Sequence, residues 1–133
     1  MANWSEILDE VQTYQDSIGK LNEIRQGFLA RINTITGRNV ISYYSGWLKN
    51  SDAPNLSIND GDINALMNAI YRLDKTKGLD IILHTPGGDI AATESIVNYL
   101  QSVFPNNIRA IIPQLSMSAG TMIALSCNSI VMG

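Results

Sequence analysis

Two short segments of the chain combine residue types that acyl-transfer chemistry uses. The first, residues 84–89, reads His-Thr-Pro-Gly-Gly-Asp, and its Gly87–Gly88 pair lets the backbone approach a ligand closely. Backbone N–H groups in such a turn can stabilise the negative charge that develops on a carbonyl oxygen. By itself the pair is not specific, because strand-to-helix turns often carry glycine for conformational reasons alone.

The second segment, residues 115–122, places Ser118 at the start of a predicted helix of small residues. A hydroxyl at this point would lie near the positive end of the helix dipole. The segment is not a G-x-S-x-G elbow, because Ser116 occupies the position of the first glycine. Considered alone, Ser118 is more simply explained as a helix N-cap, a position at which serine is common.

The spacing of the two segments makes them more informative together. Ser118 follows Gly88 by 30 residues, about the length of one strand-and-helix unit. Consecutive units of a parallel sheet bring their loops to the same edge, at the carboxyl ends of the strands. A reacting carbonyl could then lie between the serine and the N–H donors, which is the geometry that acyl transfer requires.

The elements that must position these segments follow a regular order. Runs of apolar and branched residues predict strands at 40–44, 79–83, 108–112 and 129–132. Apolar residues at helical spacing predict helices between them, ending near residues 73, 103 and 126. Because strands alternate with helices, we expect an α/β fold with right-handed crossovers and a mostly parallel sheet.

A heptad pattern of apolar residues precedes this core and predicts one long amphipathic helix over residues 4–35. Its seam consists of Trp4, Ile7, Val11, Tyr14, Ile18, Leu21, Phe28, Ile32 and Ile35, interrupted only by Arg25. Two roles are open for the helix: oligomerisation or docking, and packing on its own domain. The expected organisation is therefore an N-terminal helix over 1–36 and a core over 37–133.

Composition narrows the class of protein. The chain has 133 residues, 45% of them hydrophobic, and a net charge of −3, which suits one folded domain and disfavours nucleic acid as a partner. It shows no secretory signal and no apolar run near the length of a membrane helix. We therefore expect a soluble cytoplasmic protein. No Cys/His cluster suggests a metal site, and the end of the chain on a strand suggests C-terminal truncation.

The segments described above resemble the serine dehydrogenase proteinase family of the ClpP/crotonase clan, which is related to signal peptide peptidase A and the Clp proteolytic subunit. The resemblance rests on residues 79–88, 111–121 and 130–133, and it covers residues 57–133. It implies a spiral of ββα units around the parallel sheet and a reaction that needs no cofactor. It also implies that Ser118 is the nucleophile.

The oxyanion hole and the general base follow from the same resemblance. Gly87 and Gly88 align with the turn that lines the oxyanion hole, and the N–H of Ala119 would add a donor. His84 and Asp89 flank that turn at the substrate edge. Clp-type members use a histidine after the serine as base and signal peptide peptidase A uses a lysine, but no residue here matches either. The base is expected beyond Gly133 or from another subunit.

These expectations lead to two functions. The first is a serine peptidase that cleaves peptides or proteins through an acyl-enzyme on Ser118, within a homo-oligomer like those of its clan. The alternative is a catalytically incomplete scaffold or binding module of the same fold. An acyl-CoA enzyme of the crotonase type is a third option, which the serine disfavours because those enzymes typically use carboxylates.

Overall fold

The computed structural model describes residues 3–13 and 17–133. The chain divides into two compact units, residues 1–36 and 37–133. None of the helices formed by the described residues is both long and apolar enough to cross a bilayer.

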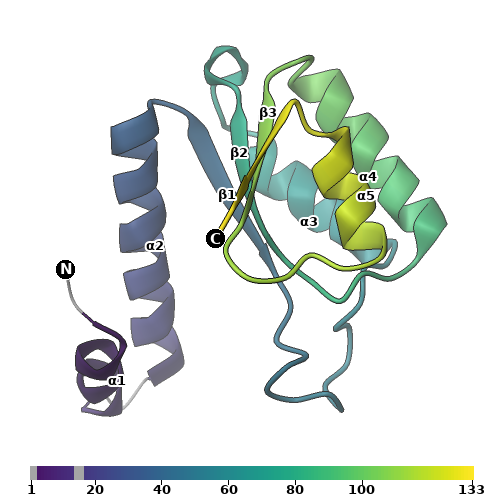
Figure 1. Cartoon of the computed structure of the whole chain (residues 1–133). Helices are drawn as coiled ribbons and strands as arrows, with labels where there is room; N and C mark the ends of the chain where they lie inside the picture. The colour runs from purple at the N-terminus through teal and green to yellow at the C-terminus, as the bar shows by residue number, and fades with distance from the viewer. Residues whose placement is uncertain (1–2, 14–16) are drawn as a thin grey trace. The chain divides into compact units, whose positions relative to one another are not determined.

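The described part of the N-terminal unit forms two helices, α1 (Trp4–Gln12) and α2 (Ser17–Thr36) (Figure 1). Asn3 begins α1 with a capping box, in which its side chain accepts from the Glu6 N–H at 3.0 Å and the Glu6 carboxylate accepts from the Asn3 N–H at 2.8 Å. Because α1 ends at Gln12, the prediction of one continuous helix over 4–35 is wrong. Tyr14, one of the seam residues, lies outside the described residues.

The apolar stripe of the heptad is folded back on itself in this unit. Ile7 of α1 and Ile24 of α2 line the same groove, and Lys20 forms an ion pair with Glu10 of α1 at 2.9 Å. Part of the apolar stripe is therefore covered within the same chain. A periodic sequence cannot distinguish this arrangement from a continuous seam, because both place apolar residues at the same spacing.

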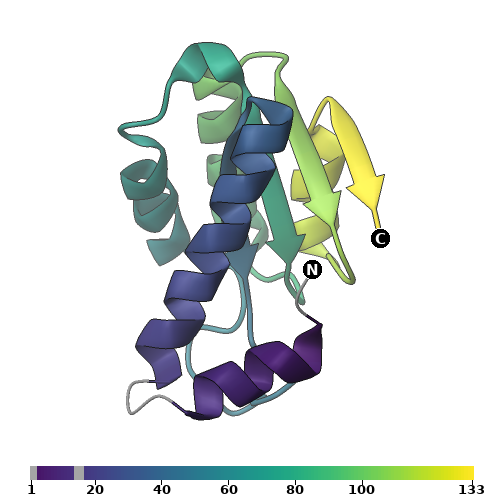
Figure 2. The same ribbon diagram turned by 90° about the vertical axis from the view of Figure 1, so that its left-hand side faces the viewer.

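The core unit is built on a parallel sheet, as expected. The described residues form four strands: β1 (Asn39–Tyr44), β2 (Leu79–His84), β3 (Ile108–Ile112) and β4 (Ser129–Met132). They are hydrogen-bonded in the order β1-β2-β3-β4, and every pair is parallel (Figure 2). The order follows the sequence, so each crossover leads to the adjacent strand.

Helices α3 (Gly61–Ile70), α4 (Ile90–Val103) and α5 (Ala119–Ser126) cover one face of the sheet (Figure 1). A short 3-10 helix, η1 (Lys75–Lys77), follows α3 and leads into β2. The core between sheet and helices is fully apolar at its centre and includes Ile70, Leu79, Ile81, Leu83, Ile96, Leu100, Phe104, Ile108, Ala110 and Ile123. It fixes the two βα loops that carry the predicted site.

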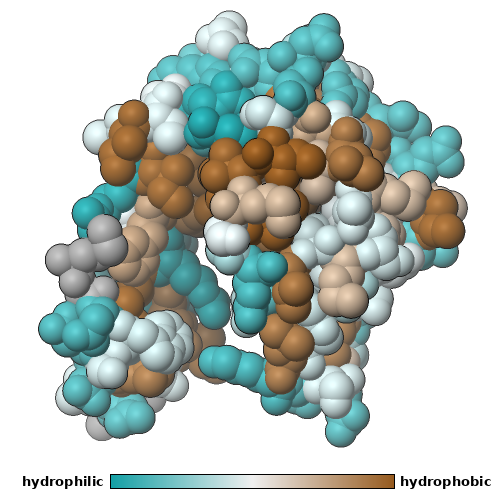
Figure 3. Space-filling view, viewed as in Figure 1, coloured by the Kyte–Doolittle hydropathy of each residue, from teal (hydrophilic) through white to brown (hydrophobic). Residues whose placement is uncertain are grey.

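Strand β4 forms one edge of the sheet, opposite β1, and its side chains are exposed. Ile130 is 39% exposed, Val131 47% and Met132 72%. Figure 3 shows hydrophobic side chains gathered over the region of β4. An unpaired apolar edge of this kind favours association with another strand.

Candidate active site

The loops after β2 and β3 lie side by side at the carboxyl edge of the sheet, as the sequence predicted. The Thr85 N–H donates to the Leu115 carbonyl at 3.2 Å, and the Met117 N–H donates to the Thr85 carbonyl at 3.0 Å. These two bonds form a parallel bridge between Thr85 and Ser116. They extend the pairing of β2 and β3 beyond the strands and hold the glycine turn against the serine turn.

Gly87 and Ser118 are in direct contact. A Cβ atom added to Gly87 would lie 2.7 Å from the Cβ of Ser118 and 2.7 Å from the carbonyl oxygen of Met117. The φ angle of Gly87 is 97°, a backbone conformation that side chains other than hydrogen rarely permit. Both observations require glycine at position 87. The close contact with Ser118 is one of the two reasons.

Ser118 has a strained backbone, and its side chain has no hydrogen bond to any residue that the structure describes. Its φ is 53° and its ψ is −122°, outside the regions that non-glycine residues normally occupy. The side chain is exposed and caps no N–H of α5. Ser118 therefore occupies the N-cap position of α5 without the side-chain hydrogen bond that normally explains a serine there. Strain of this kind is concentrated at functional sites, where the surrounding structure maintains it.

Backbone hydrogen bonds on both sides of Ser118 hold this conformation. The Gly120 N–H donates to the Met117 carbonyl at 2.8 Å, and the Thr121 N–H donates to the Ser118 carbonyl at 2.9 Å. The Thr121 hydroxyl also donates to the Ser116 carbonyl at 2.8 Å. These hydrogen bonds stabilise the turn without using the hydroxyl of Ser118.

The N–H groups around the serine differ in availability. The Gly87 N–H donates to Thr85 Oγ1 at 3.1 Å. The Asp89 N–H donates to the Ile58 carbonyl at 2.9 Å. Within residues 3–13 and 17–133, no hydrogen bond uses the N–H of Gly88 or of Ala119, the first residue of α5. These two groups are left for a ligand, whereas the N–H of Gly87 is already engaged.

Gly88 meets the backbone of the segment before α3. The Ile58 N–H donates to the Gly87 carbonyl at 2.9 Å, and Ile58 forms a parallel bridge with Gly88. A Cβ atom on Gly88 would overlap the backbone of Ile58. The glycine turn is therefore held between two neighbouring backbone segments, one carrying Ile58 and the other carrying Ser118.

His84 and Asp89, the two residues expected at the substrate edge, have structural partners. The ring of His84 is 9% exposed and stacks on Tyr44, with centroids 5.0 Å apart and planes inclined by 14°. The ring of Trp47 lies against the same histidine ring, with centroids 4.6 Å apart. Asp89 begins α4, where its Oδ1 accepts from the Ala92 N–H at 2.7 Å.

The described part of the chain shows neither a partner for the hydroxyl of Ser118 nor a cluster of metal ligands. No side chain among residues 3–13 and 17–133 forms a hydrogen bond with the hydroxyl of Ser118, and His84 is held by aromatic rings. No group of three or more His, Cys, Asp or Glu residues within these ranges could hold a metal ion.

Sequence reasoning missed two features of the site. Thr85 is fully buried, and its hydroxyl fixes the turn through Gly87; a hydroxyl residue two positions before a turn glycine is a recognisable signal. The hydroxyl of Ser116 is buried without a hydrogen-bond partner among the described residues. That feature depends on tertiary packing and has no signal in the sequence.

An apolar cavity of about 290 Å³ adjoins the serine turn. Its lining includes Met117 and Thr121, which flank Ser118 in the sequence, together with Leu125 of α5 and Met132 of β4. Met122 is 44% exposed and does not line the cavity.

The fold and the site together define a ClpP-like α/β protein with a serine at the start of the helix after the third strand. The family model of ClpP-like SDH-type serine proteinases matches residues 54–133, more than half of the chain. The chain belongs to this family, and the resemblance inferred from the two motifs is confirmed.

Two curated relatives come from Methanocaldococcus jannaschii, and both are uncharacterized proteins. One is 39% identical and the other 35% identical to this chain over 71 residues, which represent 53% of this chain. The matched region covers 24% of each relative. The chain thus spans about a quarter of the length of these relatives.

Proposed function

We propose that this chain carries the nucleophile and the oxyanion site of a serine peptidase. The observation that supports this function best is the conformation of Ser118, which is strained and in contact with Gly87. Its hydroxyl forms no hydrogen bond within residues 3–13 and 17–133. Membership of a serine proteinase family agrees with it. In this proposal, the N–H groups of Gly88 and Ala119 are the hydrogen-bond donors of the oxyanion site.

The reaction would proceed through an acyl-enzyme. The Ser118 oxygen attacks the carbonyl carbon of a peptide bond while a general base takes the hydroxyl proton. The carbonyl oxygen becomes negatively charged and accepts hydrogen bonds from the N–H groups of Gly88 and Ala119. The C–N bond then breaks, the amine leaves with the proton from the base, and water hydrolyses the resulting ester.

The general base is proposed to come from a residue outside residues 1–133 or from a second subunit. This rests on the absence of any hydrogen bond to the Ser118 hydroxyl within the described ranges. The peptide or protein substrate, the homo-oligomer and the cytoplasmic location remain predictions. The cavity lined by Met117 and Leu125 suggests that an apolar side chain lies beside the bond to be cleaved.

A second candidate is a scaffold that keeps the fold without catalysis. The lack of an identified general base for Ser118 favours this scaffold function. The strained conformation of Ser118 disfavours it, because a scaffold has no need to maintain a backbone conformation that costs about 1–3 kcal/mol.

Covalent labelling of the serine distinguishes the two functions. The chain, and any longer version of it, would be treated with a fluorophosphonate probe and analysed by intact mass. We expect one adduct that disappears in Ser118→Ala and persists in Ser116→Ala, whose hydroxyl is buried in the same turn. Labelling of the longer version alone would place the base beyond Gly133. Absence of labelling in both folded proteins would reject the peptidase function.

A further inference from the structure

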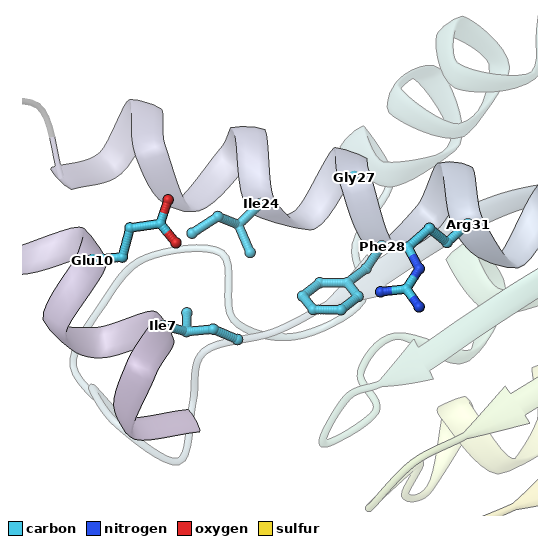
Figure 4. Close-up of a pocket in the computed structure, with 6 residues that line it drawn as sticks. All are labelled: Ile7, Glu10, Ile24, Gly27, Phe28 and Arg31. Atoms are coloured by element: carbon cyan, nitrogen blue, oxygen red, sulfur yellow. The ribbon is translucent and has the colours of Figure 1, made fainter. Parts of the chain in front are cut away.

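The two helices of the N-terminal unit enclose an open groove of about 250 Å³ (Figure 4). Ile7 of α1 and Ile24 and Phe28 of α2 form its apolar middle. Glu10 and Arg31 lie toward opposite ends (Figure 4). An apolar centre between charges of opposite sign is the arrangement found in protein interfaces.

The groove is open to a partner. The side chain of Phe28 is 38% exposed, and a Cβ atom added to Gly27 would meet no atom within 4 Å. Helix α2 has 20 residues, none of them buried. Since most helices owe their stability to packing of an apolar face, a helix this long with so little buried surface has a face left to cover.

The charges of the two helices indicate which partner fits. Within its nine residues α1 has three acidic side chains and no basic one, a net charge of −3: Glu6, Asp9 and Glu10. Helix α2 has three basic side chains and one acidic one, 3 − 1 = +2: Lys20, Arg25, Arg31 and Glu23. A surface with an acidic and a basic wall is complementary to a second copy of itself.

We propose that this groove binds the same groove of a second copy of the chain, in a two-fold symmetric dimer. Two-fold symmetry brings one end of the groove opposite the other end in the partner. Glu10 then faces Arg31 of the partner subunit, and the reverse contact forms at the other end. The two Phe28 rings fill the apolar middle.

The charged groups at the two ends agree with this arrangement. The side chain of Arg31 forms no ion pair or hydrogen bond with any residue in the described ranges. Glu10 uses one carboxylate oxygen, Oε1, for Lys20. A second carboxylate oxygen therefore remains for a guanidinium from another chain. The inference is independent of the proposed peptidase activity, because none of these residues belongs to the serine site.

Charge reversal on the whole chain tests the dimer. Glu10→Arg and Arg31→Glu would each place two like-charge pairs in the interface, and we expect each to weaken dimerisation roughly tenfold or more in sedimentation equilibrium. An equimolar mixture of the two variants should recover the native dimerisation constant. In the mixed dimer the introduced arginine faces the introduced glutamate, and native Glu10 faces native Arg31. This recovery also demonstrates that both variants fold.

Arg25→Glu is the matched control, because it makes the same charge change on α2 at a residue that does not line the groove. We expect it to leave the dimerisation constant unchanged within about twofold. A monomeric native chain would overturn the proposal. So would a mixture that associates no better than either variant alone. Loss of the dimer in Arg25→Glu with no recovery in the mixture would assign the interface to the heptad seam instead.

Discussion

The backbone around Ser118, more than the residue type, sets this serine apart from others in the chain. Serine is common at helix starts, where its side chain usually accepts a hydrogen bond from the helix. Ser118 instead adopts a φ of 53°, and its hydroxyl accepts no hydrogen bond from α5. Its conformation is maintained by hydrogen bonds on both sides and by contact with Gly87.

Alanine at position 87 tests this contact. The new Cβ atom would lie 2.7 Å from that of Ser118, at a φ of 97°. We expect Gly87→Ala to lower the free energy of unfolding by about 2 kcal/mol or more. Displacement of the serine should also slow fluorophosphonate labelling at least about tenfold. Urea denaturation and intact-mass kinetics would measure the two effects.

Gly46→Ala provides the comparison for this variant. A Cβ atom on Gly46 would lie 4.0 Å from its nearest neighbour, a ring carbon of Tyr44, which is an ordinary contact. Stability and labelling should therefore remain close to those of the native chain. If the two alanine variants behaved alike, the contact between Gly87 and Ser118 would have no role in positioning the nucleophile.

Elements are joined across the core unit by polar contacts as well as by apolar packing. The hydroxyl of Tyr43 on β1 donates to Asp62 Oδ2 in α3 at 2.8 Å. The same carboxylate oxygen accepts from the Asn59 N–H at 2.9 Å, before the start of α3. Burial raises the pKa of Tyr43 well above its ordinary value of 10.0, and the hydrogen bond with Asp62 and its negative charge raise it further.

This shift predicts a loss of stability in alkali. The raised folded-state pKa means that the contribution of Tyr43 is fully present below the unfolded-state pKa near 10. It is lost as the pH rises from there toward the folded-state value, because only the unfolded chain releases the proton. We expect the free energy of unfolding to decline above about pH 10, and the decline to be smaller in Tyr43→Phe. Urea denaturation between about pH 8 and about pH 11 would show the difference.

Tyr71→Phe is the control, since its side chain is 80% exposed and forms no comparable contact in the described residues. It should retain the native alkaline decline. An equal decline in Tyr43→Phe and in the native chain would show that Tyr43 has no part in it.

The N-terminal unit illustrates the limits of periodicity at the scale of elements. The heptad predicts helical structure over residues 4–35, and the described residues are largely helical. It does not predict the break between Gln12 and Ser17. An apolar stripe carries the same spacing whether it meets another chain or its own other half, so the pattern alone leaves the partner open.

At the scale of the core unit, an ionic cluster joins segments that are distant in the sequence. The carboxylate of Asp80 on β2 is fully buried. Arg38 binds its Oδ1, and Arg109 on β3 binds its Oδ2. Arg38 also donates to the side chain and the carbonyl of Asn107. The cluster lies near the amino ends of the strands, away from the loops that carry Ser118.

Removing the buried charge should destabilise the whole unit without altering the site. Asp80→Asn leaves two guanidinium groups around an uncharged amide, and we expect a loss of about 3 kcal/mol in the free energy of unfolding. Asp52→Asn, at an exposed carboxylate, should change it by less than about 0.5 kcal/mol. Urea denaturation measures both. Similar stability in the two variants would show that the cluster contributes little.

The sequence by itself determined the order of elements in residues 37–133 and the edge of the sheet at which the site lies. Short apolar runs and helical spacing are local patterns, and the rule that parallel strands share their carboxyl edge is general. The motifs around Gly87 and Ser118 were sufficient to identify the family.

Only the tertiary structure decided how the site is built. The strain of Ser118 and the availability of the Gly88 and Ala119 N–H groups depend on contacts formed between separate loops. The end of α1 at Gln12 likewise depends on which apolar side chains meet in space. Such contacts join residues far apart in the chain, and local sequence patterns do not encode them.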